Sequence, residues 1–372
     1  MESSKQSQKA GDNSTQMQAG VINNYFPTIT GIDESRARQI CKAEYAVAKQ
    51  NWTQEAIAIA DERVRRLEDR LLPKMIAYDN SLKFFADPAF QITLRQAQIA
   101  AASSDRESDC DMLSDLLLHR LEQRDNPQRR LGICKAIEVV DQISDEALIA
   151  LSVVYAIMKL VPISDDMLEG LSVLNNFYGK LLDHRQLPNT EDWLEHLDLL
   201  SSIRLGVESI KSFVNIQEGM SRNLSKYFVS GVEENSEELS KIKSDFMQCR
   251  IPMDFIVPHP LKLNYVKLCM SADVEQMCVM MKRKGDERIM QIPFNEKQKE
   301  VMRNAISIMR KDESKNSDLQ ERFMKEWDKL PNLKIVREWW DAMPCYFTIT
   351  PVGAALANAY IHGKDPRVPS LY

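Results

Sequence analysis

Histidine and acidic residues are the first candidates for chemistry in this chain, because they are common metal ligands and proton-transfer groups. Asp183-His184 and Glu195-His196 flank Leu187-Pro188, and their imidazoles are twelve positions apart, a spacing that matches no standard zinc site. We therefore expect surface histidines and no bound metal. The five histidines are His119, His184, His196, His259 and His362.

Two acidic pairs could hold a divalent ion, because two carboxylates can clamp such an ion for phosphodiester chemistry. The pairs are Asp109 with Asp111, and Asp165 with Asp166. Both stand where helices are expected to begin, and Asp is favoured there by capping and by the helix dipole. The sequence favours the capping role. A nuclease would need an acidic cluster formed only in three dimensions, and Mg²⁺-dependent activity would reveal it.

Motifs for phosphate or acyl chemistry are missing from the sequence. It contains no Gly-x-x-x-x-Gly-Lys-Ser/Thr loop, no Gly-x-Gly-x-x-Gly turn and no Gly-x-Ser-x-Gly elbow. Lys282, Arg283 and Lys284 could contact nucleic-acid phosphates, although three basic residues in a turn are more typical of a solvated tip. We expect no catalytic residue and no cofactor.

The N-terminal tail carries the most specific pattern in the chain. Met17, Gln18, Ala19, Gly20 and Asn23 lie in the segment Met-Gln-Ala-Gly-Val-Ile-Asn, which can form an alternating strand. Amide side chains in such a strand can form ladders between stacked copies of the same segment. The sequence thus marks residues 17–23 as a candidate self-assembly motif.

Most of the chain shows the apolar spacing of amphipathic helices separated by short polar breaks. Expected helix starts are Asp33, Thr53, Asp87-Pro88, Asp109, Asn126-Pro127, Ser144 and Ser164-Asp165-Asp166. Pro73 marks either the end of the second helix or a kink in it. The pattern predicts a bundle or array of antiparallel helices.

The residue pattern of the chain changes at the Glu-rich stretch 231–243. Residues 277–281 and 289–292 could form a hairpin around a basic turn. Residues 346–349 alternate like a strand, and Thr350-Pro351 then begins a helix to Ile361, a unit that would suit a winged helix. A similar pattern over residues 261–266 suggests a weak internal repeat. Ile335, Val336, Trp339 and Met343 share one helical face and are expected in the core.

We thus predict a mainly α-helical fold in three parts. These are a disordered tail over residues 1–31, a helical domain over 32–230, and a smaller C-terminal segment over 231–372 with short strands and a winged-helix-like character. The length of 372 residues agrees with two packed segments, because single cores seldom exceed roughly 300 residues.

Composition narrows the class of protein further. The net charge of −6, with both signs interspersed, argues against a dedicated nucleic-acid binder. Seven scattered cysteines without Cys-x-x-Cys suit a reducing compartment. Residues 1–11 lack the apolar region of a secretory signal, and the longest uncharged run, residues 147–158, is too short for a membrane span. We expect a cytoplasmic protein without a transmembrane helix.

The tail motif resembles the RIP homotypic interaction motif, in which Ile/Val-Gln precedes an apolar residue and Gly. Residues Gln18 and Gly20 match its fixed positions, while Met17 and Ala19 stand where β-branched residues are usual. That resemblance implies amyloid-like self-assembly of the kind used in cell-death signalling and in bacterial immune proteins.

A second resemblance covers the rest of the chain. Residues 31–40, 85–91, 97–98 and 135–140 look like an uncharacterised bacterial family found beside mobile and defence genes. The helical plan and the closing segment Ile-Thr-Pro-Val-Gly, residues 349–353, resemble the Abi-alpha abortive-infection family. Neither family supplies catalytic residues that could be carried over.

Two functional hypotheses follow. The leading one is a bacterial anti-phage or abortive-infection protein that acts by self-association or by binding a phage or host protein, with the helical body as sensor or effector. The alternative is a DNA-binding regulator that uses the C-terminal winged-helix-like segment.

Overall fold

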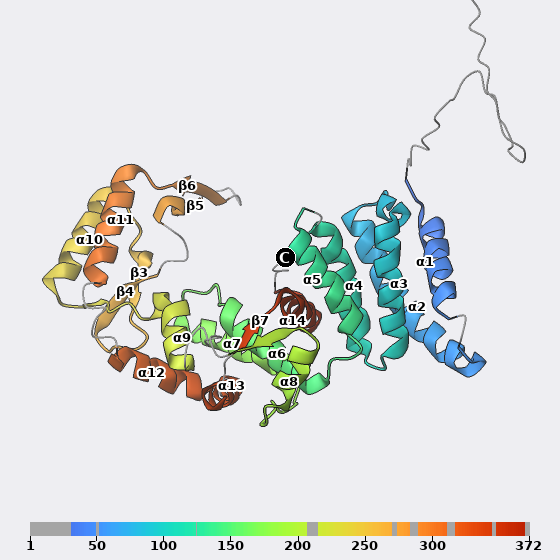
Figure 1. The fold of residues 1–372 in the computed structure, drawn as a ribbon. Helices are drawn as coiled ribbons and strands as arrows, with labels where there is room; N and C mark the ends of the chain where they lie inside the picture. The colour runs from blue at the N-terminus through green and yellow to red at the C-terminus, as the bar shows by residue number, and fades with distance from the viewer. Residues whose placement is uncertain are drawn as a thin grey trace, which may run out of the picture.

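The computed structural model describes residues 31–49, 52–123, 125–206, 215–269, 274–282, 289–310, 317–343 and 347–368. Helices dominate, as predicted, and the strands form only small sheets. Figure 1 shows an array of helices at one end and a smaller unit with strands at the other. The mainly α-helical class is thus confirmed.

The first part of the chain is an array of helices that pack side by side (Figure 1). Its helices are α1 (Glu34–Ala48), α2 (Gln54–Tyr78), α3 (Pro88–Ser103), α4 (Glu107–Glu122), α5 (Pro127–Val139), α6 (Asp145–Lys159), α7 (Met167–Leu182) and α8 (Asp192–Leu199), with a short 3₁₀ turn η1 (Lys83–Ala86).

Helix starts follow the capping residues seen in the sequence. Asp33, Thr53, Asp87, Asn126 and Ser144 each accept a hydrogen bond from a backbone N–H of the first turn that follows. Such caps satisfy amides that have no partner inside the helix, typically at a gain of about 1 kcal/mol each. The helix starts predicted at these residues are therefore confirmed.

The structure decides two local expectations. Of the two possibilities at Pro73, an end or a kink, the end is ruled out, because α2 continues to Tyr78 and Asp79 terminates it. Asp109 does not cap a helix, because α4 begins at Glu107 and Asp109 is buried in its first turn.

The second part contains the remaining elements. They are β1 (Ile203–Leu205), α9 (Ile216–Asn223), η2 (Ser225–Tyr227), β2 (Val232–Glu233), α10 (Glu237–Cys249), η3 (Met253–Phe255), β3 (Ile256–Pro258), β4 (Tyr265–Leu268), η4 (Val274–Gln276), β5 (Cys278–Lys282), β6 (Ile289–Pro293), α11 (Glu296–Met309), α12 (Ser317–Asp328), α13 (Pro331–Ala342), β7 (Phe347–Ile349) and α14 (Pro351–Lys364).

Three small antiparallel sheets connect these elements. The strands β1 and β7 pair with Ile203 opposite Ile349, and β4 lies between β2 and β3. The hairpin predicted around the basic turn is confirmed, because β5 and β6 pair from Cys278 with Pro293 to Lys282 with Ile289. The suggested repeat over residues 261–266 is wrong, since Asn264 leads into strand β4 rather than a helix.

Two hydrophobic cores divide the chain differently from the boundary expected at residue 231. The second core does begin there, with side chains from Val232 to Met309 of α10, α11 and the neighbouring strands. Residues from Leu319 onward, however, return to the first core and pack with the helices of residues 34–199. The unit over 232–309 is therefore an insertion between two parts of one helical body.

Helix α14 completes the first core rather than forming part of a separate winged helix. It packs against α4, α5 and α6, and all its residues from Leu356 to Ile361 are buried. A DNA-recognition helix needs an exposed face to enter the major groove. A strand that leads into a helix at Thr350 is present, as predicted. Helix α14, however, has no exposed face that could enter a DNA groove.

Helix α13 packs its aromatic residues inside the fold. Val336 and Trp340 are buried, and Nε1 of Trp339 donates a hydrogen bond to the Pro188 carbonyl at 2.8 Å. Ile335, in contrast, is 47% exposed. The expected core face is thus correct at Val336 and Met343 but wrong at Ile335.

Candidate functional site

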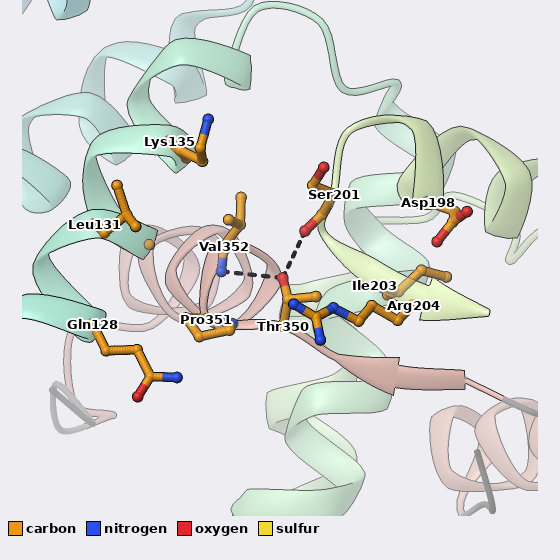
Figure 2. A pocket seen from close by; sticks show the side chains of 11 residues that line it. Gln128, Leu131, Lys135, Asp198, Ser201, Ile203, Arg204, Thr350, Pro351 and Val352 are labelled. Atoms are coloured by element: carbon orange, nitrogen blue, oxygen red, sulfur yellow. Dashed lines mark hydrogen bonds between the residues drawn. The ribbon is translucent and has the colours of Figure 1, made fainter. Parts of the chain in front are cut away.

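A solvent-open hollow of about 440 Å³ lies where three distant parts of the chain meet. Helix α5 forms one wall, the turn from α8 into β1 forms the other, and the start of α14 forms the floor. Figure 2 shows Leu131 and Lys135 on one side, Ser201 and Asp198 on the other, and Thr350 between them. Pockets of this size commonly hold small ligands.

Thr350 fixes the floor of this hollow. Its Oγ1 donates a hydrogen bond to the Ser201 carbonyl at 2.7 Å and accepts one from the Val352 N–H at 3.2 Å. Its backbone N–H also donates to the Ser202 carbonyl at 3.1 Å. The residue that caps α14 therefore also attaches that helix to the turn before β1.

Two glycines allow the walls to approach the floor closely. A Cβ atom at Gly353 would lie 2.1 Å from the Ser202 carbonyl oxygen, and one at Gly132 would lie 2.7 Å from Cβ of Pro351. Neither position can accept a larger residue without movement of the backbone. The shape of the hollow thus depends on both glycines.

The hollow combines an apolar surface with charged side chains at its edge. Leu131 and Pro351 are exposed, and Ile203 and Val352 lie buried beneath them. Among the charged lining residues, the side chains of Lys135 and Arg204 make no ion pair or hydrogen bond with any described residue. Asp198 supplies one negative charge, and its Oδ1 accepts the Leu205 N–H at 3.3 Å. This arrangement can bind and orient a ligand.

The residues singled out from the sequence do not form part of this hollow. Met17, Gln18, Ala19, Gly20 and Asn23 lie outside the described residues. Of the basic turn, Lys282 is the last residue of β5, and Arg283 and Lys284 lie outside the described residues.

The acidic pairs take separate structural roles. Asp111 accepts from Nε of Arg70 at 2.6 Å, whereas Asp109 accepts from Ser104 and Arg106. Asp166 caps α7 by accepting the Glu169 N–H at 2.8 Å, and Asp165 lies 3.5 Å from Nζ of Lys226. Within the described residues, no three His, Cys, Asp or Glu side chains form a potential metal site.

The histidines are not all on the surface. His119 and His259 are buried, and burial lowers the pKa of each to about 4. His184 is exposed in the turn after α7, and Nε2 of His196 accepts the Ser144 N–H at 3.1 Å. The surface position expected for the pair His184 and His196 is confirmed for His184, whereas His196 is half-buried.

A second polar cluster joins three helices of the body. The carboxylate of Asp115 on α4 accepts from Lys74 of α2 at 2.5 Å and from His362 of α14 at 2.9 Å. Asp115 itself is almost fully buried. Its two partners satisfy its charge, so the cluster has the features of a structural link between helices.

Sequence reasoning found Thr350-Pro351 as a helix start but missed the hollow. Lys135, Arg204 and Thr350 come from separate elements, and no local motif connects them. The only sequence signal near the site was the Ile-Thr-x-x-Gly segment at residues 349–353.

A protein-family model matches residues 31–367, which is nearly the whole described chain. The chain belongs to that family, which is uncharacterised. The match spans both the helical body and the insertion over residues 232–309. No curated protein and no solved structure matches the chain.

None of the described helices combines the length and the apolar character that a bilayer span requires.

Proposed function

We propose that this protein is a bacterial anti-phage defence protein of the abortive-infection type, which acts in the cytoplasm by self-association or by binding a protein partner. In this proposal residues 17–23 drive assembly and the helical body is the sensor. Support comes from the resemblance of Gln18 and Gly20 to the RIP homotypic interaction motif, and of residues 349–353 to the Abi-alpha family.

The observation that carries the sensor role is the hollow between α5, β1 and α14. It is open to solvent, it presents apolar side chains beside two cations without a described partner, and it lies against the last helix of the body. A ligand in this hollow would contact three distant segments at once. Such a ligand can shift a conformational equilibrium if it binds one arrangement of these segments better than another.

The test of this function combines plaquing with solution mass. Cells expressing the full chain should reduce plaque formation by some members of a broad phage panel, and a chain lacking residues 1–30 should not. Light scattering on a sizing column should show large assemblies for the full chain only. Unchanged plaquing across the panel, or the same discrete mass for both chains, would contradict the proposal.

A matched pair of variants separates the motif from general properties of the tail. Gln18→Ala with Gly20→Val changes the two positions that match the motif, and Gln6→Ala with Gly11→Val makes the same changes outside it. Only the first pair should abolish assembly, because it removes the amide ladder and the small residue of the strand.

The DNA-binding regulator remains the second candidate, and the hairpin β5–β6 is the observation that favours it. Its first strand ends at Lys282, and Arg283 and Lys284 come next in the sequence. Salt-sensitive binding to duplex DNA that is lost when all three are changed to Gln would favour this function. Because α14 is buried, such binding would use the hairpin and not that helix.

A further inference from the structure

Lys135 and Arg204 differ from most cationic residues in the helical body. Arg70, Arg95 and Arg106, for example, each lie in an ion pair with a neighbouring carboxylate. Lys135 and Arg204 line one hollow, and their side chains have no hydrogen bond or ion pair to a described residue. Two such cations against the single carboxylate of Asp198 leave the described lining with a net positive charge, which favours an anionic group.

The anion would have to be held by these side chains and not by the first amides of α14. Pro351 has no N–H, and the N–H groups of Val352 and Gly353 already donate to Oγ1 of Thr350. The positive end of the α14 dipole still adds to the potential on the floor. Recognition of the charge therefore depends on Lys135 and Arg204.

The rest of the lining requires an apolar body on the ligand. Leu131 is 60% exposed, and Pro351 lies beside it on the floor. Covering such carbon surface with a ring or an alkyl group gains roughly 25 cal/mol for each Å² removed from water. A simple inorganic ion would leave this surface exposed and so would not fill the hollow.

We propose that the hollow binds a small molecule with one anionic group, a phosphate or a carboxylate, attached to an apolar or aromatic body. Lys135 and Arg204 contact the anion, and Leu131 and Pro351 contact the body. The identity of this ligand class rests on the sensor role proposed above, and it names what that sensor recognises. The volume of about 440 Å³ accommodates a ligand of this kind.

The experiment uses the full chain and three simple compounds: phenyl phosphate, benzoate and neutral benzyl alcohol. Saturation-transfer NMR titrations should show binding of one or both anions, and much weaker binding of the alcohol. Binding of phenyl phosphate alone identifies a phosphate ligand, and binding of benzoate alone identifies a carboxylate. Equal binding of both would show that charge and ring suffice, which also supports the proposal.

Variants test the residues that carry the proposal. Lys135→Gln and Arg204→Gln should each weaken anion binding by about tenfold, because each removes one charge-assisted contact. Lys83→Gln is the matched control, since Lys83 is also exposed but lies in η1, away from the hollow, and it should leave binding unchanged. Binding of neither anion, or undiminished binding by both variants, would overturn the proposal.

The outcome can be separated from that of the proposed function. The titrations need neither phage nor assembly. If phage plaquing falls while neither anion binds, the defence function stands and the ligand proposal fails. If an anion binds through Lys135 and Arg204 while plaquing is unchanged, the site stands and the defence function fails.

Discussion

Nδ1 of His362 on α14 lies 2.9 Å from Oδ2 of Asp115 on α4. The same carboxylate accepts from Nζ of Lys74 on α2, so one buried acid connects three helices. The hydrogen bond to Asp115 raises the pKa of His362. The pKa of Asp115 is lowered, although burial alone would raise it, because His362 and Lys74 favour its charged form.

This pair predicts a pH-dependent contribution to stability. A raised histidine pKa stabilises the fold below the unfolded-state value of about 6.5, and this stabilisation is lost as pH rises through the raised value. His362→Gln should therefore lower the free energy of unfolding more at about pH 5.5 than at about pH 9, by roughly 1–2 kcal/mol. Urea unfolding of both proteins at the two pH values measures this difference.

The comparison must be between wild type and variant at each pH. Burial lowers the pKa of His119 to about 4, so this residue destabilises the fold as pH falls below 6.5, opposite in sign to His362. Both proteins contain His119, so the burial penalty on its charge is common to them, and the difference retains only its electrostatic coupling to His362. A variant effect that is equal at the two pH values would show that His362 does not gain a proton in this range.

Asn358 gives the second prediction. It is fully buried on α14, and neither its Oδ1 nor its Nδ2 has a hydrogen-bond partner among the described residues. Asn358→Leu has similar volume and removes two unsatisfied groups, so it should raise the free energy of unfolding by about 1–3 kcal/mol. Urea unfolding at neutral pH is the measurement.

Asn175→Leu is the control for that change. The Asn175 side chain accepts the Asn332 N–H at 3.0 Å, so its replacement should destabilise the fold. A loss of stability in Asn358→Leu would instead indicate an ordered water or a ligand beside that amide.

The third prediction concerns two glycines of α14. Gly353→Ala should destabilise the protein by about 1–3 kcal/mol, because its Cβ would lie 2.1 Å from the Ser202 carbonyl oxygen. Gly363→Ala should instead stabilise it by about 0.5–1 kcal/mol, because its Cβ would have no contact closer than 3.9 Å and Ala favours helix. Thermal unfolding of both variants would show opposite shifts, and equal shifts would contradict the geometry.

Arg106 gives the fourth prediction. Its guanidinium contacts the buried Asp109 at 3.1 Å and Asp145 at 2.9 Å, and it donates to the carbonyls of Val140 and Ile143. Arg106→Met would leave Asp109 buried without its cation and should cost about 3–5 kcal/mol.

The double variant Arg106→Met/Asp109→Leu should recover part of this loss, because it removes the uncompensated charge as well. Urea unfolding of the single and double variants measures the recovery. Equal stability of the two would mean that the loss comes from the contacts of Arg106 with Asp145 and with the two carbonyls.

Local features of the fold were readable from the sequence, because a helix cap and a hairpin turn depend on neighbouring residues. The caps at Thr53, Ser144 and Thr350 and the hairpin around Lys282 all follow from such signals. The continuation of α2 beyond Pro73 does not, since packing of the flanking residues Leu72 and Met75 in the core competes with the local effect of proline.

The candidate site could not be predicted, because it depends on contacts between residues far apart in the chain. Ile203 pairs with Ile349 across more than a hundred residues, and this pairing, together with the hydrogen bonds of Thr350 to Ser201 and Ser202, brings Arg204 and Thr350 into one hollow. The same limitation explains why residues 346–361 were expected in a separate winged helix. Nothing in the pattern of residues 346–361 distinguishes a helix inserted in a core from one in a winged helix.

The position of α14 has a consequence for protein synthesis. Its residues 355–361 fill the space between α4, α5 and α6, yet they are translated after the whole 232–309 unit. During translation, the apolar surfaces of α4, α5 and α6 that α14 covers therefore stay exposed, while the insertion can already form its own core. A chain that stops before Pro351 would leave this apolar surface permanently exposed and should be captured by chaperones or degraded.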